Sequence, residues 1–489
     1  MTRTATRYET VIGVEVHAQL LTRSKMFCSC SQPTPESPPN THVDPTCLGM
    51  PGAMPVINRL AVELTILSGL ALNCEIAAEA KFDRKNYHYP DLMKGYQISE
   101  YDMPICTNGW LDIEVDGQTK RIGITRVHLE EDTARLQHAK DPSTGEQYSL
   151  VDVNRSGVPL MEVVSEPDIR SAEEARAYLQ ALRRILRYIG ASQANMDEGN
   201  MRCEPNVSIR EPGAEFGQRV ELKNINSFKH AFDAIKFEER RQAEVLDSGG
   251  TVAQETRGWR EDIGKAVPQR TKEFAEDYRY FPEPDLPPLL ISREWVEEIR
   301  ARLPELPDAK RARFQEQYSL TAYDAQVLSE STARADFFEA ATAGGSAERA
   351  KAVSNWITGD FARLLNAENA EIQNARVTPE SLAALIDLQE AGTISGKTAK
   401  AVFEEMFALG KAPGEIVKEK GLEQITSSDE VVTSVEKVIA DNAKAVEDYR
   451  GGKEEAIKFL VGQVMRETRG RASPDVITEL LKEKLAEKP

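Results

Sequence analysis

The chain has 489 residues, of which 40% are hydrophobic and 29% are charged. This length and apolar content allow more than one hydrophobic core, and we expect about two to four domains. The formal net charge of −18 excludes a strongly basic protein that binds polyanions non-specifically, because each phosphate contact needs a lysine or arginine. A local basic patch is still compatible with this net charge.

The N-terminal segment Met1–Tyr8 is polar and lacks the apolar core of a signal peptide. No stretch approaches the roughly 18 consecutive apolar residues that a membrane-spanning helix needs. We therefore expect a cytoplasmic protein. In that compartment the six cysteines are expected to be thiols or metal ligands rather than disulfides.

Short β-branched segments bounded by Gly, Pro, Asn or Asp recur through the first half of the chain, a pattern typical of β-strands. A capping box at Ser171 opens an amphipathic helix that ends at Gly190, and a second helix covers Phe228–Leu246. This half is predicted to be α+β, with a mixed β-sheet. The predicted strands are Val11–Leu20, Leu111–Val115, Arg121–Leu129, Ser149–Val153, Pro159–Val164 and Asn206–Ile209.

The proline-rich segment Phe281–Pro288 predicts the boundary to a helical half. We expect three domains: residues 1–292 with the sheet, an all-α domain at 293–410, and a small helical C-terminal tail at 411–489. The predicted helices after the boundary are Arg293–Leu303, Ala322–Ala341, Ala347–Leu365, Pro379–Ala391, Thr398–Leu409, Glu454–Arg466 and Pro474–Leu485.

The segment Gly392–Thr398 resembles a phosphate-binding P-loop but departs from it in two ways. Only three residues separate its glycines, whereas the motif has four, and a helix rather than a strand is predicted before it. We therefore predict a helix–turn–helix corner, with Gly392 ending one helix and Ser395 capping the next.

The first predicted strand places Glu15, His17 and Gln19 on one face and apolar residues on the other. A carboxylate and an imidazole two residues apart point into the same space and suit a divalent cation. A solvated strand face is the alternative, and the strand taken alone favours it.

Two further places concentrate carboxylates. The segment His128–Asp132 ends a strand with an acidic cluster, and alternation places Glu131 on the side of Val127 and Leu129 unless a bulge intervenes. Glu162 is the lone charge in the apolar segment Pro159–Val164. A buried carboxylate must be protonated, paired or bound to a cation, so both a metal and an arginine partner fit.

The segment Lys81–Asp91 mixes cations, amides and aromatic residues, a mixture common at nucleotide and nucleic-acid sites and also found in ordinary charged loops. Its cations can meet phosphates and its tyrosines can stack on a base or ribose. The candidate binding residues there are Lys81, Asp83, Arg84, Lys85, Tyr87 and Tyr89.

Cys28, Cys30, Asp44 and Cys47 have the outline of a zinc knuckle, in which two ligand pairs lie on tight turns. Three thiols and one carboxylate can bind zinc, though less tightly than four thiolates. Small buried thiols without metal are the alternative.

Together these motifs resemble the B-subunit family of aspartyl/glutamyl-tRNA amidotransferases (GatB), in family order and over essentially the whole chain. Each motif is short, so the number of motifs in register makes the resemblance specific. The segments with this resemblance are Tyr8–His17, Lys81–Tyr87, Lys94–Ser99, His128–Asp132, Val164–Asp168, Ala231–Gln242, Gln254–Thr256, Asp277–Asp285, Val353–Trp356 and Phe459–Met465.

The resemblance implies a heterotrimer in which an amidase-type A subunit releases ammonia from glutamine and a small C subunit joins the other two. The B subunit would bind mischarged tRNA, Glu on tRNA(Gln) or Asp on tRNA(Asn). With ATP and Mg²⁺ it would phosphorylate the side-chain carboxylate, and ammonia would then displace phosphate to give the amide. The first domain would be a cradle, and the helical domain and tail would grip the tRNA.

Carried onto this chain, the resemblance implies His17, Glu131 and Glu162 as magnesium ligands, with Glu15 adjacent to them. Lys81 and its neighbours would line the pocket where the aminoacyl end and nucleotide meet. In the tail, the cations implied for tRNA binding are Lys458, Arg466, Arg469 and Arg471.

One departure concerns zinc. Family members with the knuckle have Cys-x-x-Cys as the second pair, whereas this chain has Asp44 in place of the first cysteine, and other members lack the cysteines. We predict weak zinc binding or none. Two alternatives stay open. One is a tRNA-binding scaffold without its own catalysis. The other is the archaeal E subunit, but that family carries an additional inserted domain, for which the chain after Pro288 is too short.

Overall fold

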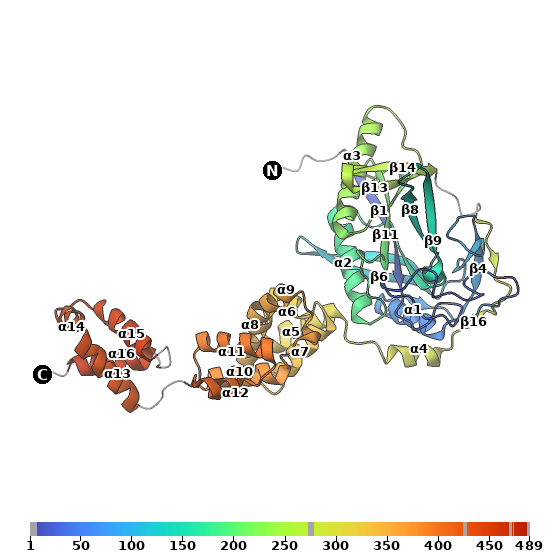
Figure 1. Cartoon of the computed structure of the whole chain (residues 1–489). Coiled ribbons are helices and arrows are strands. Elements are labelled where there is room, and N and C mark those ends of the chain that lie inside the picture. Colours follow the sequence, from blue (N-terminus) through green and yellow to red (C-terminus); the bar gives the residue numbers. More distant parts are fainter. Residues whose placement is uncertain (1–6, 272–277, 424–427, 469–471, 473, 487–489) are drawn as a thin grey trace. The chain divides into compact units, whose positions relative to one another are not determined.

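The computed structural model describes residues 7–271, 278–423, 428–468, 472 and 474–486. The chain divides into two compact units, residues 1–307 and 308–489. The first unit contains a mixed β-sheet with helices, and the described part of the second is helical (Figure 1). This confirms the predicted α+β class. Among the described residues, no helix has the length and apolarity needed to cross a membrane.

Within the described residues, twelve strands of the first unit form one sheet in the order β14-β13-β12-β11-β1-β10-β7-β5-β4-β15, with β6 and β2 branching from β7. Most neighbours are antiparallel, whereas β12 and β13 are parallel. The bounds are β1 Glu9–Gln19, β2 Glu75–Ile76, β4 Phe82–Asn86, β5 Tyr96–Glu100, β6 Cys106–Val115, β7 Gln118–Glu131, β10 Pro159–Ser165, β11 Met201–Arg210, β12 Val220–Lys223, β13 Glu255–Arg260, β14 Lys265–Thr271 and β15 Phe281–Pro282.

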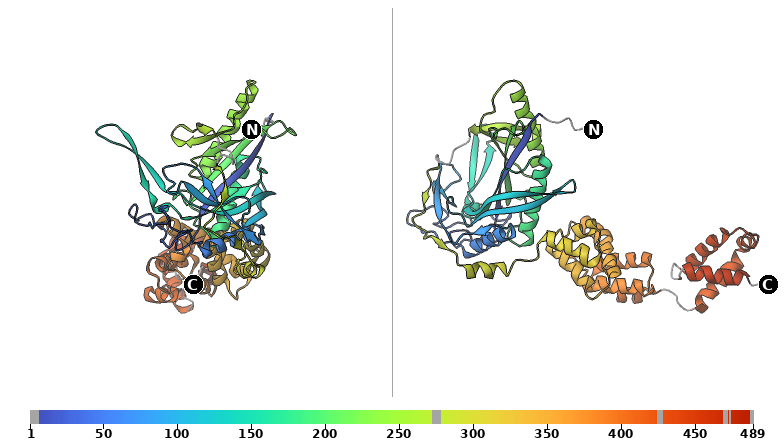
Figure 2. Two further views of the ribbon diagram at one scale, coloured as in Figure 1. Left: turned by 90° about the vertical axis from the view of Figure 1, so that its right-hand side faces the viewer. Right: turned by 180° about the vertical axis from the view of Figure 1, so that it is seen from behind.

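Two smaller strand pairs lie outside this sheet. The strands β8 (Arg135–Lys140) and β9 (Gln147–Asp152) form a hairpin that extends from the unit (Figure 2). The strands β3 (Glu79–Ala80) and β16 (Leu289–Leu290) pair with each other.

Among the described residues, helices of the first unit pack on one face of the large sheet and share a core with it. The central strand β1 alternates as predicted, with Ile12, Val14, Val16 and Ala18 buried. These side chains share a core with helices α1 (Arg59–Ala71), α2 (Ala172–Tyr188) and α3 (Phe228–Asp247). The odd-numbered residues of β1 therefore face the opposite side, which holds the polar side chains of the site.

The second unit contains two hydrophobic cores. Helices α5–α12 contribute to the first and α13–α16 to the second. The bounds are α5 Pro307–Tyr318, α6 Ala322–Leu328, α7 Thr332–Thr342, α8 Ala347–Trp356, α9 Ala362–Glu368, α10 Pro379–Glu390, α11 Gly396–Leu409, α12 Pro413–Lys420, α13 Ser428–Asp441, α14 Ala443–Arg450, α15 Ala456–Glu467 and α16 Pro474–Ala486.

Two helices near the ends of the predicted domain ranges pack on the core of the preceding domain. Helix α4 (Arg293–Arg300) belongs to the first unit, because Trp295 and Val296 pack on the core beneath the sheet, so that unit continues beyond residue 292 to Pro307. Helix α12, placed in the tail by sequence, contributes Ile416 and Val417 to the first helical core. A few apolar residues attach each of these helices to its core, and composition does not show such packing.

The P-loop-like segment is a helix–turn–helix corner, as predicted. Helix α10 ends at Glu390, Gly392 has a φ of +69°, and the Ser395 hydroxyl accepts a hydrogen bond from the Thr398 amide at the start of α11. At the start of α2 the Ser171 hydroxyl accepts from the Glu174 amide, while the Glu174 carboxylate accepts from the Arg170 amide.

Candidate functional site

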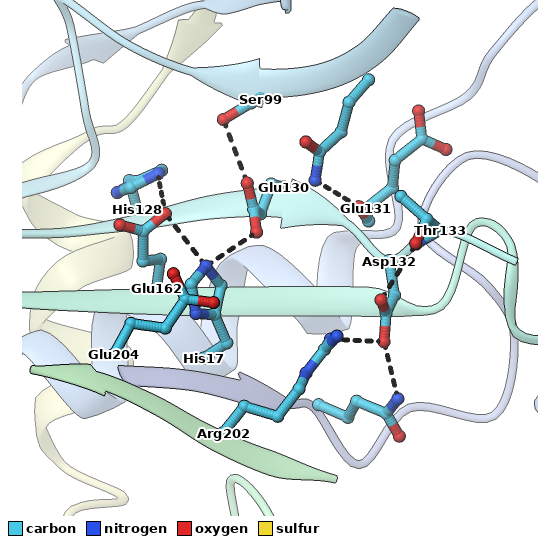
Figure 3. Close-up of polar contacts among 12 residues, drawn as sticks. His17, Ser99, His128, Glu130, Glu131, Asp132, Thr133, Glu162, Arg202 and Glu204 are labelled. Carbon is cyan, nitrogen blue, oxygen red and sulfur yellow. Dashed lines mark hydrogen bonds and ion pairs between the residues drawn. The ribbon is translucent and has the colours of Figure 1, made fainter. Parts of the chain in front are cut away.

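The polar face of the sheet brings one histidine–carboxylate row together across three strands. His17 on β1 is the cross-strand partner of Glu162 on β10, and Glu162 is the partner of His128 on β7. Partners in an antiparallel pair project to the same face. Glu130 follows His128 by two residues and therefore joins them (Figure 3).

His17 lies between two buried carboxylates. Its Nε2 is 3.5 Å from Glu130 Oε1 and 3.4 Å from Glu162 Oε2. His128 Nε2 lies 3.3 Å from the same Glu162 oxygen. Arg126 Nε donates to His128 Nδ1, so His128 holds its proton on Nε2 and donates it to Glu162.

The pKa values of these groups are shifted by burial and by the charges of neighbouring side chains. Burial alone would lower the pKa of His17, but Glu162 and Glu130 raise it to about 9. Burial would likewise raise the pKa of Glu162, yet His128 and His17 hold it well below its usual range. Burial raises the pKa of Glu130. The imidazolium of His17 thus offsets the negative charge of Glu162 and Glu130, as a bound metal cation would.

This donor set fits a divalent cation. His17, Glu130 and Glu162 each offer a ligand atom, and these three atoms lie within 4.8 Å of one another. Two carboxylates and one imidazole are ligands that Mg²⁺ or Mn²⁺ accepts. The fit is compatible with the predicted roles of His17 and Glu162, and the third carboxylate beside them is Glu130.

Glu131 lies outside this cluster, so the structure does not bring together the three residues that the resemblance implied as ligands. Its carboxylate lies 2.6 Å from Lys94 Nζ and accepts a hydrogen bond from the Ile98 amide. It lines a separate hollow of about 80 Å³ beside Cys47. No bulge reverses β7 at this point, so strand alternation places Glu130 toward His17 and Glu131 away from it.

A second acidic group adjoins the cluster. Glu15, Glu204 and Glu221 offer carboxylate oxygens within 4.8 Å of one another. Lys223 Nζ lies 2.6 Å from Glu204, and Asn206 donates to Glu15 at 2.9 Å. Glu15 therefore belongs to a separate acidic group beside the histidine cluster, and Lys223 offsets part of the negative charge of that group.

Asp132 anchors the end of the same face. Burial would raise its pKa, but Arg202 and Arg155 lower it to about 2. Arg202 lies 2.8 Å from it, and Gln19 Nε2 donates to it at 2.8 Å (Figure 3). The buried Asp132 carboxylate thus holds the partly exposed Arg202 side chain in place.

These residues line a cavity of about 380 Å³. Of the six candidates in the segment Lys81–Asp91, Lys85 and Tyr87 line it. Burial opposes the charge of Lys85, yet Tyr280 and Glu130 raise its pKa above the usual value. Lys85 Nζ lies 5.0 Å from the ring centroid of Tyr278, which with Tyr280 completes an aromatic wall.

The other candidates of that segment have structural partners. Lys81 bridges Asp83 and Asp102. Arg84 projects to the opposite face of β4, where its guanidinium makes two hydrogen bonds to Glu283. Tyr89 is 49% exposed and does not line the cavity. Strand alternation in β4 separates Lys85 from Arg84.

The four candidate zinc ligands Cys28, Cys30, Asp44 and Cys47 do come together, with ligand atoms within 4.8 Å of one another. However, Asp44 Oδ1 accepts the amides of Thr46 and Cys47, at 2.8 and 3.0 Å. The buried Lys25 ammonium lies 3.6 Å from Cys47 Sγ. Hydrogen bonding from Cys28 lowers the pKa of Cys47 to about 6. The Lys25 ammonium thus already offsets the charge of the Cys47 sulfur, which a bound zinc ion would need as a ligand.

The tail candidates are partly described. Lys458 and Arg466 lie exposed on α15, whereas Arg469 and Arg471 lie outside the described residues. Sequence reasoning missed several cavity residues, including Glu130, His128, Arg202, Glu204, Tyr278 and Tyr280. Alternation from His128 would have selected Glu130. The others depend on strand order, which no local pattern supplies.

Comparison with known proteins shows which family this chain is similar to. The model of the GatB/GatE catalytic domain matches residues 10–297, and that of the GatB domain matches residues 336–485. The aspartyl/glutamyl-tRNA(Asn/Gln) amidotransferase B subunit of Dehalococcoides mccartyi is 54% identical over 491 residues, 99% of this chain and 100% of that protein. The protein of the same name from Carboxydothermus hydrogenoformans is 56% identical over 480 residues, 98% of this chain and 99% of that protein. The chain belongs to the family of aspartyl/glutamyl-tRNA(Asn/Gln) amidotransferase B subunits.

Proposed function

We propose that this chain is the carboxylate-activating, tRNA-binding subunit of a tRNA-dependent amidotransferase, a ligase that forms carbon–nitrogen bonds with glutamine as nitrogen donor. Its substrates are Glu attached to tRNA(Gln), Asp attached to tRNA(Asn), or both. The names of its relatives support this assignment. The reaction overcomes one chemical obstacle: the oxygen of a carboxylate is a poor leaving group.

The reaction has two steps. In the first, a side-chain carboxylate oxygen attacks the γ-phosphorus of ATP, the bond to the β-phosphate oxygen breaks, and ADP leaves. In the second, ammonia attacks the carbonyl carbon of the acyl phosphate, inorganic phosphate leaves, and the nitrogen loses a proton. The product is the amide on the tRNA. Ammonia comes from glutamine hydrolysed by the amidase-type A subunit.

The observation that supports this site best is the cluster of His17, Glu130 and Glu162 at the floor of a cavity lined also by Lys85. These three would hold Mg²⁺, which when bound would neutralise phosphate charge and polarise the transferred group. Lys85 is a fixed cation able to offset charge on the phosphates or the attacked carboxylate. The tyrosines Tyr87, Tyr278 and Tyr280 shape the wall against which the aminoacyl end lies.

The remaining assignments concern partners. We propose a heterotrimer in which this chain is joined by an amidase-type A subunit plus a small C subunit, in the cytoplasm. Lys458 and Arg466, exposed on α15, would contact tRNA phosphates, as would Arg469 and Arg471. Such contacts position the tRNA body without reading its sequence.

The test is reconstitution. The chain is combined with the A and C subunits, glutamine, ATP and each mischarged tRNA, and amide formation is scored with and without ATP. We expect ATP-dependent Gln-tRNA(Gln), Asn-tRNA(Asn) or both, and ADP formed in equal amount. Amide formation with no need for ATP, or none with either tRNA, would refute the proposed function.

A further inference from the structure

Three of the six cysteines lie together in the first unit, outside the histidine–carboxylate cluster. The sulfurs of Cys28, Cys30 and Cys47 are within 4.8 Å of one another. All six cysteines are free thiols in the structure. The other three belong to the hydrophobic core of the same unit: Cys74, Cys106 and Cys203. The cluster therefore brings together thiols that are near enough to react with each other.

Three hydrogen-bond donors surround the sulfur of Cys47. The backbone amide of Asp44 lies 3.2 Å from it, and the ammonium of Lys25 lies 3.6 Å from it. The thiol of Cys28 is the third donor. Donors and a neighbouring cation favour the thiolate over the thiol, and the thiolate is the form of cysteine that reacts. Cys47 is therefore the nucleophile of the cluster.

The cation beside this sulfur is fixed by the fold. Lys25 is completely buried. Its Nζ also donates to the carbonyl oxygens of His42 and Val153, at 2.7 and 3.5 Å. A buried ammonium is costly unless acceptors or an anion surround it, and a Cys47 thiolate supplies the anion. The two groups thus stabilise each other in their charged forms.

Cys28 is the partner placed to form a bond with Cys47. Its side chain is hydrogen-bonded to Cys47, so the two sulfurs already lie against each other. The two residues come from separate segments, and the carboxylate of Asp44 fixes the turn before Cys47 by accepting the amides of Thr46 and Cys47. A bond from Cys28 to Cys30 is disfavoured, because only one residue separates them and the small ring strains a disulfide.

Small molecules have a route to this pair. Cys28 and Cys47 both line the hollow of about 80 Å³ that also contains Glu131. A water needs about 10–15 Å³, so a molecule as small as hydrogen peroxide fits beside the two sulfurs. In the core, by contrast, burial raises the pKa of Cys74 to about 12, and neutral buried thiols of that kind are unreactive.

We propose that Cys28 and Cys47 are a modification site, at which hydrogen peroxide oxidises the two thiols to a reversible disulfide. The Cys47 thiolate attacks one peroxide oxygen, the S–O bond forms, the O–O bond breaks, and the departing hydroxide takes up a proton to give water. The Cys28 thiol then attacks the sulfenic sulfur, the S–S bond forms, the S–O bond breaks, and a second water leaves with the thiol proton. The two sulfurs lose two electrons, and the peroxide gains them.

The disulfide has two consequences for its surroundings. It removes two of the sulfurs that a zinc ion would need, so oxidation and metal binding exclude each other. It also leaves the buried Lys25 ammonium without its anionic neighbour, which favours the reduced pair. A dithiol should therefore reduce this disulfide readily, as expected for labile rather than structural disulfides. The site is independent of the proposed carboxylate-activating function.

The test uses the full chain, reduced, freed of metal with a chelator and then exposed to hydrogen peroxide. Remaining thiols are alkylated, and peptides are analysed by mass spectrometry without reductant. We expect a linked peptide pair that contains Cys28 and Cys47, lost again after dithiothreitol. Cys47→Ser should slow thiol oxidation at least about tenfold. Cys30→Ser, which removes the third thiol of the same cluster, is the matched control and should form the disulfide at the wild-type rate.

A second variant tests the proposal even where Cys47→Ser does not fold. Cys28→Ser keeps the reacting sulfur but lacks its partner, so dimedone should trap a sulfenic acid on Cys47. No linked peptide, a link through Cys30 instead of Cys28, or dimedone on neither cluster sulfur in Cys28→Ser would overturn the proposal. Oxidation of the core thiol Cys74 before the cluster would also overturn it. None of these outcomes concerns ATP-dependent amide formation, so the two proposals fail separately.

Discussion

His17 on β1 and Glu162 on β10 are direct cross-strand partners, and His17 Nε2 lies 3.4 Å from Glu162 Oε2. The pair joins two segments that are far apart in the sequence, and each alone had an ordinary structural explanation. Because Glu162 is also bonded to His128, its carboxylate is held at one position between two imidazoles. A fixed carboxylate of this kind suits a metal ligand.

The neighbouring carboxylates Glu130 and Glu131 should behave differently. Glu130→Gln removes a carboxylate from the cluster and is expected to lower ADP formation with mischarged tRNA about 100-fold or more, with a higher Mg²⁺ requirement. Glu131→Gln should leave the Mg²⁺ concentration for half-maximal ADP formation unchanged, because Glu131 contacts Lys94 instead. The measurement is a Mg²⁺ titration of ADP release. A shifted Mg²⁺ dependence in Glu131→Gln and not in Glu130→Gln would restore the ligand set that resemblance implied.

Glu100 should make the stability depend on pH. It is 2% exposed, its Oε1 has no hydrogen-bond partner among the described residues, and burial raises its pKa from 4.5 to about 8. The folded state holds this proton more tightly than the unfolded state, so the stabilisation is complete below pH 4.5 and is lost as the pH rises through about 8. Glu100→Gln, which keeps an acceptor for the Leu129 and Ile105 amides, should not show this loss.

The check is thermal unfolding of both proteins at about pH 5 and about pH 8.5. The Tm advantage of Glu100→Gln should be several degrees larger at the higher pH. Equal Tm differences at the two pH values would mean that Glu100 is ionised in the folded protein.

The cysteine cluster should bind zinc weakly or not at all. Lys25 lies 3.6 Å from Cys47 Sγ, and Asp44 is engaged by two backbone amides. Asp44→Cys is expected to give one tightly held zinc, because four thiolates bind zinc more strongly. Zinc content after dialysis against a chelator is measured for both proteins. One equivalent retained by the wild type would contradict this prediction.

The tail should affect tRNA affinity and leave nucleotide affinity unchanged. Lys458→Glu with Arg466→Glu on α15 is expected to raise the KM for mischarged tRNA about tenfold, more at low salt, because charge reversal removes phosphate contacts. The KM for ATP should stay constant. Lys397→Ala in the P-loop-like corner is a further control and should also leave the KM for ATP unchanged. If the KM for tRNA is unchanged in this double variant, α15 does not contact the tRNA.

Local patterns predicted the elements of the fold more successfully than the site. Period-two alternation located β1 and its polar face, and the segment around Glu162 was correctly predicted as a strand. Helix α1 and the division of Ala322–Ala341 into α6 and α7 were missed. Helix α1 lacks a strong apolar stripe because nearly all its positions are buried, so periodicity gives no signal there.

The site depends on strand order and register, which sequence periodicity does not contain. The pairing of β10 with both β1 and β7 is what joins Glu162 to His17 and His128. Resemblance supplied His17 and Glu162 but selected Glu131, whereas the register of β7 in the structure places Glu130 beside them. Tyr278 and Tyr280, nearly two hundred residues from Tyr87, reach the cavity only through the fold.

The central claim is that carboxylate activation takes place at the His17–Glu130–Glu162 cluster. The most direct measurement is single-turnover ADP formation by the assembled enzyme with mischarged tRNA, comparing wild type with His17→Ala and Glu162→Gln and measuring tRNA binding in parallel. We predict that both variants lose ADP formation by at least about 100-fold while their tRNA affinity stays within error of wild type. ADP formation at the wild-type rate in both variants would contradict the account and would leave the chain as a tRNA-binding scaffold.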